Sequence, residues 1–204
     1  MDIKLKKSNI FILFLLILLT FNYFYTLENV KAEKIYWKQI KEEVEKKLNN
    51  NPEEKNIMLN FKLAVASANI GEVKNAYQIM DSLGENVTEK EFQNIVNNYI
   101  KNMQINNLND KIMLWNYTAF SAIIGDEYNQ AIKYFKKIKN KKPENIWIRN
   151  FMAASYFELD NLDKAKIIAN KTLKIQENEF SHLILGAVHY QKGHYIKSIK
   201  ELHQ

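Results

Sequence analysis

Apolar and small residues recur in the second half of the chain with a period of about 34 positions. Three small residues, Ala131, Ala165 and Ser198, are 34 and then 33 positions apart. Each follows a turn residue and lies among apolar residues at helical spacing. Two antiparallel helices cross closely only where small side chains let their backbones approach, while larger apolar residues fill the flanks. The pattern therefore predicts a series of helix pairs.

The same frame of large, small and aromatic residues fills three segments, at about 112–145, 146–178 and 179–204. Its members are Trp115, Ala119, Tyr128, Ala131 and Phe135 in the first segment, Ala153, Tyr156, Ala165 and Ala169 in the second, and Leu185, Gly186, Tyr195 and Ser198 in the third. These segments resemble tetratricopeptide repeats. One such helix pair cannot bury its own apolar face, so the resemblance implies an all-α solenoid of stacked helix-turn-helix repeats with a concave and a convex side.

A weaker copy of the frame lies at about 57–87, where Ala64, Gly71 and Ala76 occupy the corresponding positions. Between this copy and the next there are 21 residues more than one repeat needs. Thr88 and Glu91 form a capping box at the start of these residues, followed by apolar positions at helical spacing. We therefore expect an extra helix at about 88–104 that interrupts the array, and a solenoid that spans 57–204.

A separate amphipathic helix is expected at 33–51. Trp37, Ile40, Val44 and Leu48 fall on one stripe of this helix, while lysine and glutamate occupy the other faces. We expect the helix to cap the N-terminal side of the array.

The first 32 residues have the features of an export signal. Three lysines among the first seven residues precede an apolar run from Ile10 through Phe21, and Val30 and Ala32 have the small side chains and spacing that a signal peptidase accepts. We predict a cleavable signal peptide in residues 1–32, with an uncleaved signal anchor as the alternative. Both predictions place the rest of the chain outside the cytoplasm, either secreted or anchored in the membrane.

Composition excludes several kinds of chemistry. The chain has 204 residues and no cysteine, so it has no disulfide, no thiol nucleophile and no cysteine-linked lipid. The sequence shows no nucleophile with an adjacent base, no glycine-rich phosphate loop and no zinc motif. His182 and His189, seven positions apart, are a weak candidate for a metal pair, because their frame positions normally pack against the second helix and no carboxylate is placed to complete a metal shell. We therefore expect a protein that is not an enzyme and has no cofactor.

The formal net charge is +6, and its densest part is the lysine-rich stretch from Lys133 to Lys142. Lys133, Lys136 and Lys137 lie on the side of their helix opposite Ala131, so we expect them to face solvent on the convex surface. We expect no nucleic-acid partner, whereas an anionic envelope polymer or lipid headgroup remains an alternative.

The resemblance implies that a ligand would bind in the concave groove, along the first helix of each repeat. Apolar and aromatic groove residues suit an extended or a helical peptide. Asn116 and Asn150 take the same frame position in adjacent repeats, and polar groups are costly to bury without partners. The alternative is that neighbouring helices bury these residues. The predicted groove residues are Met113, Asn116, Phe120, Ile123, Trp147, Asn150, Phe157, Phe180 and Tyr190. Ile124, Ala154, Glu158, Leu183, Ala187 and Gln191 share the corresponding frame positions. The basic groove residues with which some relatives of this family clamp a carboxylate are absent.

Two functions follow from this pattern. The first is an exported scaffold that binds a peptide or protein segment in its groove. The second is a structural subunit that assembles with itself, or joins an envelope complex, through its last repeat. The sequence places Gln204 inside the second helix of that repeat with no polar capping helix after it, so Tyr195, Ile199 and Leu202 are expected to be exposed.

Overall fold

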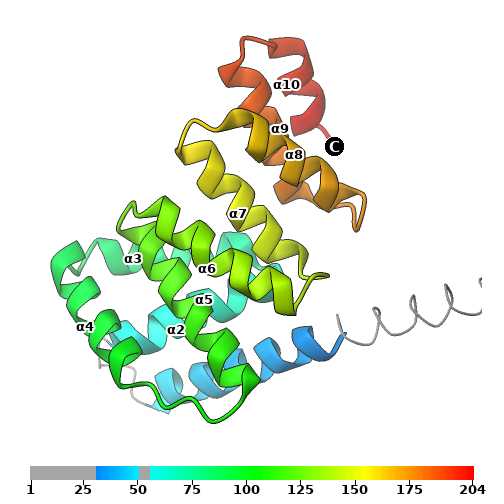
Figure 1. The fold of residues 1–204 in the computed structure, drawn as a ribbon. Helices are drawn as coiled ribbons and strands as arrows, with labels where there is room; N and C mark the ends of the chain where they lie inside the picture. The colour runs from blue at the N-terminus through cyan, green and yellow to red at the C-terminus, as the bar shows by residue number, and fades with distance from the viewer. Residues whose placement is uncertain (1–30, 51–55) are drawn as a thin grey trace, which may run out of the picture.

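The computed structural model describes residues 31–50 and 56–204, and this part of the chain consists of helices and turns without a strand (Figure 1). The all-α fold predicted from the sequence is confirmed. A helix over residues 31–50 comes first and is unlabelled in Figure 1. It is followed by α2 (Ile57–Ile70), α3 (Val73–Gly84), α4 (Glu89–Asn102), α5 (Leu108–Ile124), α6 (Tyr128–Lys141), α7 (Ile146–Glu158), α8 (Leu162–Leu173), α9 (Glu179–Gln191) and α10 (Tyr195–Leu202).

The helices pair as antiparallel hairpins, α2 with α3, α5 with α6, α7 with α8, and α9 with α10. The last three hairpins stack in chain order, because α6 packs on α7, α8 on α9, and α7 on α9 (Figure 1). This stack is a tetratricopeptide-like α-solenoid. The helix expected at about 88–104 is observed as α4, and the side chain of its N-cap Thr88 accepts a hydrogen bond from the Glu91 amide, as in the predicted capping box.

The repeat also appears in the backbone of the turns. Each hairpin turn holds one residue in the left-handed region, namely Gly71 (φ 95°), Asp126 (53°), Asp160 (55°) and Gly193 (73°). The amide after each of these residues donates to a carbonyl five residues earlier, which closes the C-terminus of the first helix. Glycine and aspartate tolerate this conformation better than other residues. The last three of these positions are 34 and 33 residues apart, the same spacing as the small residues.

The small residues lie where the paired helices cross. Ala119 and Ala131 are fully buried at the α5–α6 crossing, and Ala153 and Ala165 at the next. At the third crossing, the Ser198 hydroxyl donates to the Gly186 carbonyl at 2.8 Å. A β-carbon on Gly186 would meet the Leu202 side chain at 2.8 Å, which is too close. Close approach of the backbones therefore explains the small-residue frame.

The α2–α3 hairpin departs from a simple stack. In addition to α3, α2 packs against α4, α5 and α7. Phe61 of α2 meets Phe92 of α4 edge to face, with ring centroids 5.3 Å apart, and lies 5.8 Å from the ring of Tyr117 in α5. At the other end of α2, Gly71 lies beneath the indole of Trp147, at the start of α7. The hairpin thus covers part of the inner side of the array, which is formed by the first helices of the repeats.

The predicted stripe of the N-terminal helix is buried. Trp37 and Val44 are inaccessible to solvent or nearly so, and Ile40 and Leu48 are half-buried. This helix contacts more of the array than a cap on the first repeat would. Its Lys41 ammonium lies 2.8 Å from the Glu72 carboxylate at the α2–α3 turn.

The same helix also reaches the start of α5 and of α7. The Tyr36 hydroxyl lies 3.9 Å from the Met113 sulfur, and the Asn145 side chain donates to Glu33 at 2.7 Å. Burial raises the pKa of Glu33 despite this hydrogen bond and the nearby Lys142. Through Lys41, Tyr36 and Glu33 the helix therefore contacts three parts of the array.

Residues 1–30 and 51–55 lie outside the described part of the chain, so nearly all of the predicted export signal does too. Among the helices of 31–50 and 56–204, none is both long and apolar enough to cross a membrane.

Candidate functional site

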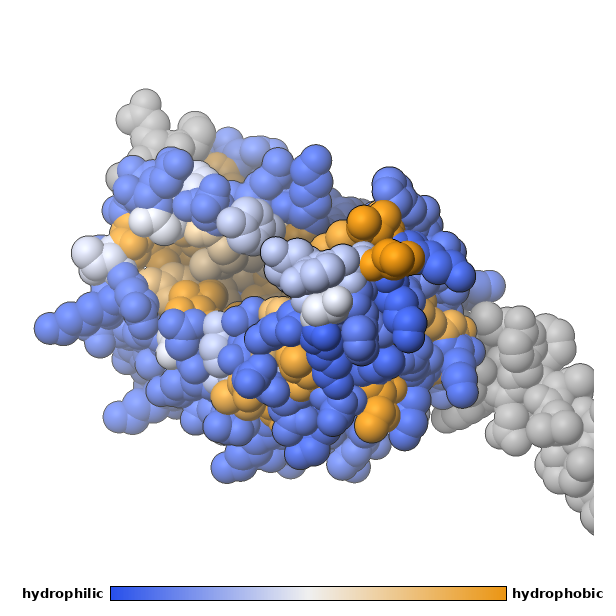
Figure 2. Space-filling view, turned by 90° about the horizontal axis from the view of Figure 1, so that it is seen from above, coloured by the Kyte–Doolittle hydropathy of each residue, from blue (hydrophilic) through white to orange (hydrophobic). Residues whose placement is uncertain are grey.

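A groove with a volume of about 1140 Å³ opens between α3, α5, α7 and α9, and residues of α2 and of the end of α10 also line it. Figure 2 shows a hollow with apolar side chains inside and hydrophilic residues around it. The apolar lining residues are Phe61, Ala64, Val65, Ala68, Val73, Ala76, Tyr77, Met80, Phe120, Ile123, Ile124, Tyr128, Phe151, Ala154, Phe180, Leu183 and Leu202.

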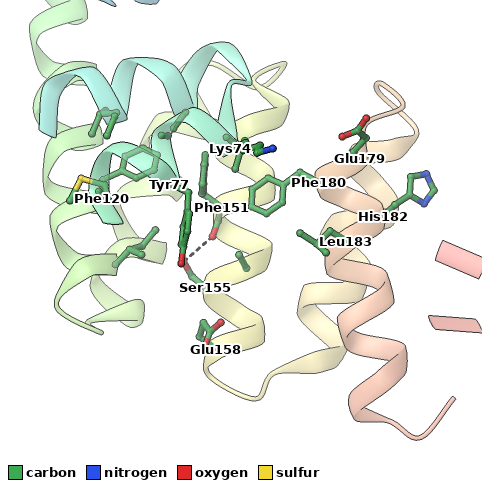
Figure 3. Close-up of a pocket in the computed structure, with 18 of the residues that line it drawn as sticks. Lys74, Tyr77, Phe120, Phe151, Ser155, Glu158, Glu179, Phe180, His182 and Leu183 are labelled. Atoms are coloured by element: carbon green, nitrogen blue, oxygen red, sulfur yellow. Dashed lines mark hydrogen bonds between the residues drawn. The ribbon is translucent and has the colours of Figure 1, made fainter. Parts of the chain in front are cut away.

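Three phenylalanines form the floor of this groove. The rings of Phe120 and Phe151 are 4.8 Å apart, and those of Phe151 and Phe180 are 5.2 Å apart, both edge to face. They come from α5, α7 and α9 in turn, and Figure 3 shows them in this order. Because edge-to-face packing fixes each ring against the next, the floor is a preformed apolar surface.

The walls carry apolar side chains that are open to solvent. Tyr77 of α3 is 70% exposed, and Leu183 of α9 and Leu202 of α10 are each 55% exposed. Figure 3 shows Tyr77 and Leu183 projecting from different helices toward the groove. A large exposed apolar surface in a concave site is typical of an interaction surface.

Polar groups lie mainly at the rim. The floor includes one hydroxyl, that of Ser155, which donates to the Phe151 carbonyl at 2.8 Å within α7 (Figure 3). The charged lining residues are Lys74, Glu158, Glu179 and Glu201. The floor therefore offers a ligand apolar contact and few free hydrogen-bonding groups.

Three of the nine predicted groove residues, Phe120, Ile123 and Phe180, line this groove. Four further residues that share the corresponding frame positions also line it, namely Ile124, Ala154, Glu158 and Leu183. The structure thus brings together positions from the second half of α5, the second half of α7 and the first half of α9.

Asn116 and Asn150 do not face the groove, and their expected exposure to a ligand is corrected. Both are fully buried. The Asn116 side chain accepts from Asn69 of α2 at 3.0 Å. Asn150 accepts from the Ser181 hydroxyl at 2.7 Å and donates to Asn178 at 2.7 Å. Hydrogen bonds to polar groups of neighbouring segments compensate for the burial of both amides, so neither needs a ligand as its partner.

The other four predicted residues lie elsewhere. Met113 is half-buried next to Tyr36 of the N-terminal helix, and Trp147 packs over Gly71. Phe157 is half-buried against the core. Tyr190 is 66% exposed, with its ring 5.5 Å from that of Tyr195, and it is outside the groove lining.

The α3 wall was not predicted from the sequence, and neither were Phe151 of the floor and the α2 residues of the lining. Val73, Tyr77 and Met80 line the groove from α3. Their spacing of four and three positions was a visible signal, but the second helix of a repeat was assigned to the convex side. The wall arises because the α2–α3 hairpin folds over the inner side of the array.

A histidine next to the groove has two acidic partners. The Nδ1 of His182 lies 2.7 Å from the Glu201 carboxylate of α10, and Nε2 contacts Glu177 in the α8–α9 loop. Burial alone lowers the pKa of His182, but hydrogen bonds to the two carboxylates outweigh it, so the pKa is raised. Neither of these two carboxylate partners was predicted from the sequence. Within the described residues, no group of three histidine or acidic side chains is arranged to hold a metal ion.

The predicted convex lysines are mostly at the surface. Lys133 and Lys136 are exposed. Lys137 is half-buried, with its ammonium 4.5 Å from the ring centroid of Tyr134 and 5.7 Å from that of Trp115. These lysines lie outside the groove lining, so they form no part of the candidate site.

Comparisons with known proteins give no family assignment. No protein-family model matches the chain, and no curated protein is significantly similar to it. Among solved structures, MamA from MSR-1 is 12% identical, with a TM-score of 0.42 over 89% of this chain and 92% of that one. MamA from AMB-1 is 13% identical, with a TM-score of 0.42 over 89% of this chain and 94% of that one. Similarity at this level does not identify a shared function.

Proposed function

We propose that the protein is a non-enzymatic scaffold that binds an amphipathic helix of a partner protein in the groove between α3, α5, α7 and α9. The observation that carries this proposal is the open apolar groove, with the Phe120, Phe151 and Phe180 rings as its floor. Its volume of about 1140 Å³ exceeds the range of roughly 300 to 1,000 Å³ that is typical of small-molecule sites. A segment of a protein suits such a surface better than a metabolite does.

A helix suits the floor better than an extended segment does. An extended peptide leaves its backbone N–H and C=O groups in need of partners. Asn116 and Asn150, which were predicted to line the groove, are buried, and the Ser155 hydroxyl already bonds within its own helix. A helix satisfies its own backbone and presents apolar side chains along one face.

The proposed place of action is outside the cytoplasm. The support is the lysine-rich start and the apolar run from Ile10 through Phe21, which precede the solenoid in the sequence. The scaffold would be secreted if this signal is cleaved and held at the membrane if it is not. A partner in this compartment would be a protein and not a nucleic acid.

Affinity capture with a pair of matched variants tests the proposal. Leu183 and Ile167 are 55% and 53% exposed, but only Leu183 lines the groove. We expect full-length chain and the Ile167→Asp variant to capture the same partner, and the Leu183→Asp variant to lose it. A synthetic peptide of the bound segment should then bind directly and gain helical circular dichroism. Equal capture by both variants would contradict groove binding.

A second candidate function is self-association through α10. The frame positions of Phe135 in α6 and Ala169 in α8, both fully buried, correspond to Leu202 in α10, which is 55% exposed. Ile132 of α6 is 5% exposed, whereas the corresponding Ile199 of α10 is 57% exposed. The apolar face that a following helix covers in α6 is thus open in α10 among the described residues.

Light scattering distinguishes this second candidate. If α10 joins two copies, full-length chain should dimerise or form larger species at micromolar concentration, and the Ile199→Asp variant should be monomeric. The Ile167→Asp variant should behave like the unmodified chain. A monomer at all concentrations would exclude self-association.

A further inference from the structure

The rim of the groove is acidic, whereas the chain as a whole is basic. Its lining includes three glutamates and one lysine, together with His203 and with His182, which pairs with Glu201, against a formal net charge of +6 for the chain. Glu158, at the C-terminal end of α7, and Glu179, at the start of α9, are both exposed. Within the described residues neither forms an ion pair. Two carboxylates at the rim are therefore free to meet a cation.

Tyr128, which also lines the groove, lies beside acidic groups. Its hydroxyl donates to Asp126 at 2.7 Å. This hydrogen bond, partial burial and the nearby charges of Asp126 and Glu158 raise the pKa of Tyr128 to about 12. Acidic groups from the α5–α6 turn and from α7 thus converge next to a residue of the lining.

We infer that the partner helix carries lysine or arginine residues beside its apolar face, and that Glu158 and Glu179 select it. This inference rests on the proposed function and specifies the chemistry of the occupant. Lysine and arginine stems cover apolar surface while their charged ends reach a nearby carboxylate. Such residues would lie along the edges of the apolar floor and extend to the glutamates on α7 and α9.

Lys74 lies on a different helix of the lining from Glu158 and Glu179, and this arrangement predicts how the partner helix is oriented. Lys74 lies on the α3 wall, and Glu158 and Glu179 lie on α7 and α9 (Figure 3). The basic flank of the partner helix should therefore face α7 and α9, and its neutral or acidic flank should face α3. Complementary charges of this kind raise the association rate and discriminate against wrong partners.

Two synthetic helices test the inference on the full-length chain. Both are 18-residue labelled peptides with the same leucine face, one with a lysine flank and the other with a glutamate flank. We expect the lysine peptide to bind about tenfold more tightly at low salt, from a few exposed charge pairs. The difference should shrink as ionic strength rises. Non-specific attraction to a chain of net charge +6 would favour the glutamate peptide instead.

Charge variants localise the effect to the rim. The Glu158→Lys/Glu179→Lys double variant should abolish or reverse the preference, and Lys74→Glu should strengthen binding of the lysine peptide. A gain of affinity in the second variant is a result that damage to the fold does not produce. Lys133→Glu, at an exposed position outside the groove lining, is the matched control and should leave the preference unchanged.

The outcomes separate the two proposals. Equal affinity for both peptides, with loss of both in Leu183→Asp, would overturn the charge selection and leave helix binding in the groove supported. A preference for the lysine peptide that persists in Leu183→Asp and in Glu158→Lys/Glu179→Lys would overturn both the charge selection and helix binding in the groove. Failure of the lysine peptide to bind would also overturn the inference.

Discussion

Gly71 fixes the position of the α2–α3 hairpin against α7. Its φ of 95° is in the left-handed region, and a β-carbon at this residue would lie 2.2 Å from the Trp147 indole. The residue therefore combines two requirements, an unusual backbone conformation and space for a large ring. This contact explains why Trp147, which was predicted to line the groove, instead packs against the α2–α3 turn.

We predict that Gly71→Ala lowers the free energy of unfolding by about 2–4 kcal/mol, from left-handed strain plus overpacking. Two matched variants separate these causes. Gly193→Ala has the strain but nothing within 4 Å, and Gly84→Ala has neither a positive φ nor a close neighbour. Urea unfolding should rank the losses in the order 71, 193 and 84. Equal losses at 71 and 193 would contradict the Trp147 contact.

The buried amide of Asn150 holds α7 to α9. It bonds to Ser181 and Asn178, which is also the N-cap of α9. We predict that Asn150→Ala destabilises the fold by about 1–3 kcal/mol, because it leaves buried polar groups without partners. Asn170→Ala removes an exposed amide that bonds only to its own helix, and should cost much less. Similar losses in denaturant unfolding would contradict a structural role for Asn150.

The sequence predicted the small-residue frame well and the groove residues only in part. A small side chain at a crossing depends on local repeat geometry, which the period reveals. The exposure of Asn116 depends on Asn69, 47 positions away, and the sequence contains no sign of that contact. The same holds for Trp147 and Gly71. The exposure of a residue cannot be predicted from the repeat frame where a contact with a residue distant in sequence determines it.

At the scale of elements, α10 is joined to the rest of the array by a titratable contact. His182 of α9 lies between Glu201 of α10 and Glu177 of the preceding loop. Because the pKa of His182 is raised in the folded state, this contact contributes stability that is present below pH ~6.5 and is lost as pH rises through the folded pKa.

We therefore predict that His182→Gln lowers the melting temperature more at pH 6 than at pH 9. Buried His189, whose pKa is lowered by burial, is present in both proteins and cancels in the comparison. The exposed His203→Gln variant serves as control. The same loss of stability at both pH values would show that the imidazolium is not what holds α10.

Helical periodicity indicated the helices, because they carry apolar positions at helical spacing and several, among them α4, α5 and α7, begin with a side-chain cap. It did not place the α2–α3 hairpin relative to the array. That arrangement depends on the Phe61, Phe92 and Tyr117 cluster, which joins three helices. The groove wall on α3 is a consequence of this tertiary packing.

Considering the whole molecule, a ligand that binds in the groove should increase the stability of the fold. A ligand that binds only the folded state at a free concentration 100 times its Kd adds about 2.7 kcal/mol to the free energy of unfolding. For a domain of this size the lysine-flanked peptide should raise the melting temperature by roughly 5–10 °C. The Leu183→Asp variant should show little or no increase, and an equal increase would place the binding site elsewhere.

The central claim is that the groove receives a helix of a partner protein, and site-specific photo-crosslinking tests it most directly. A photoreactive phenylalanine analogue at position 77, on the groove wall, is compared with the same analogue at position 167, on α8 outside the groove. If the groove receives such a helix, crosslinks from position 77 should fall on one amphipathic segment of the captured partner, spaced three and four residues apart, and none should form from position 167. Crosslinks from position 167 alone, or none from position 77 to a partner that is captured, would contradict this claim.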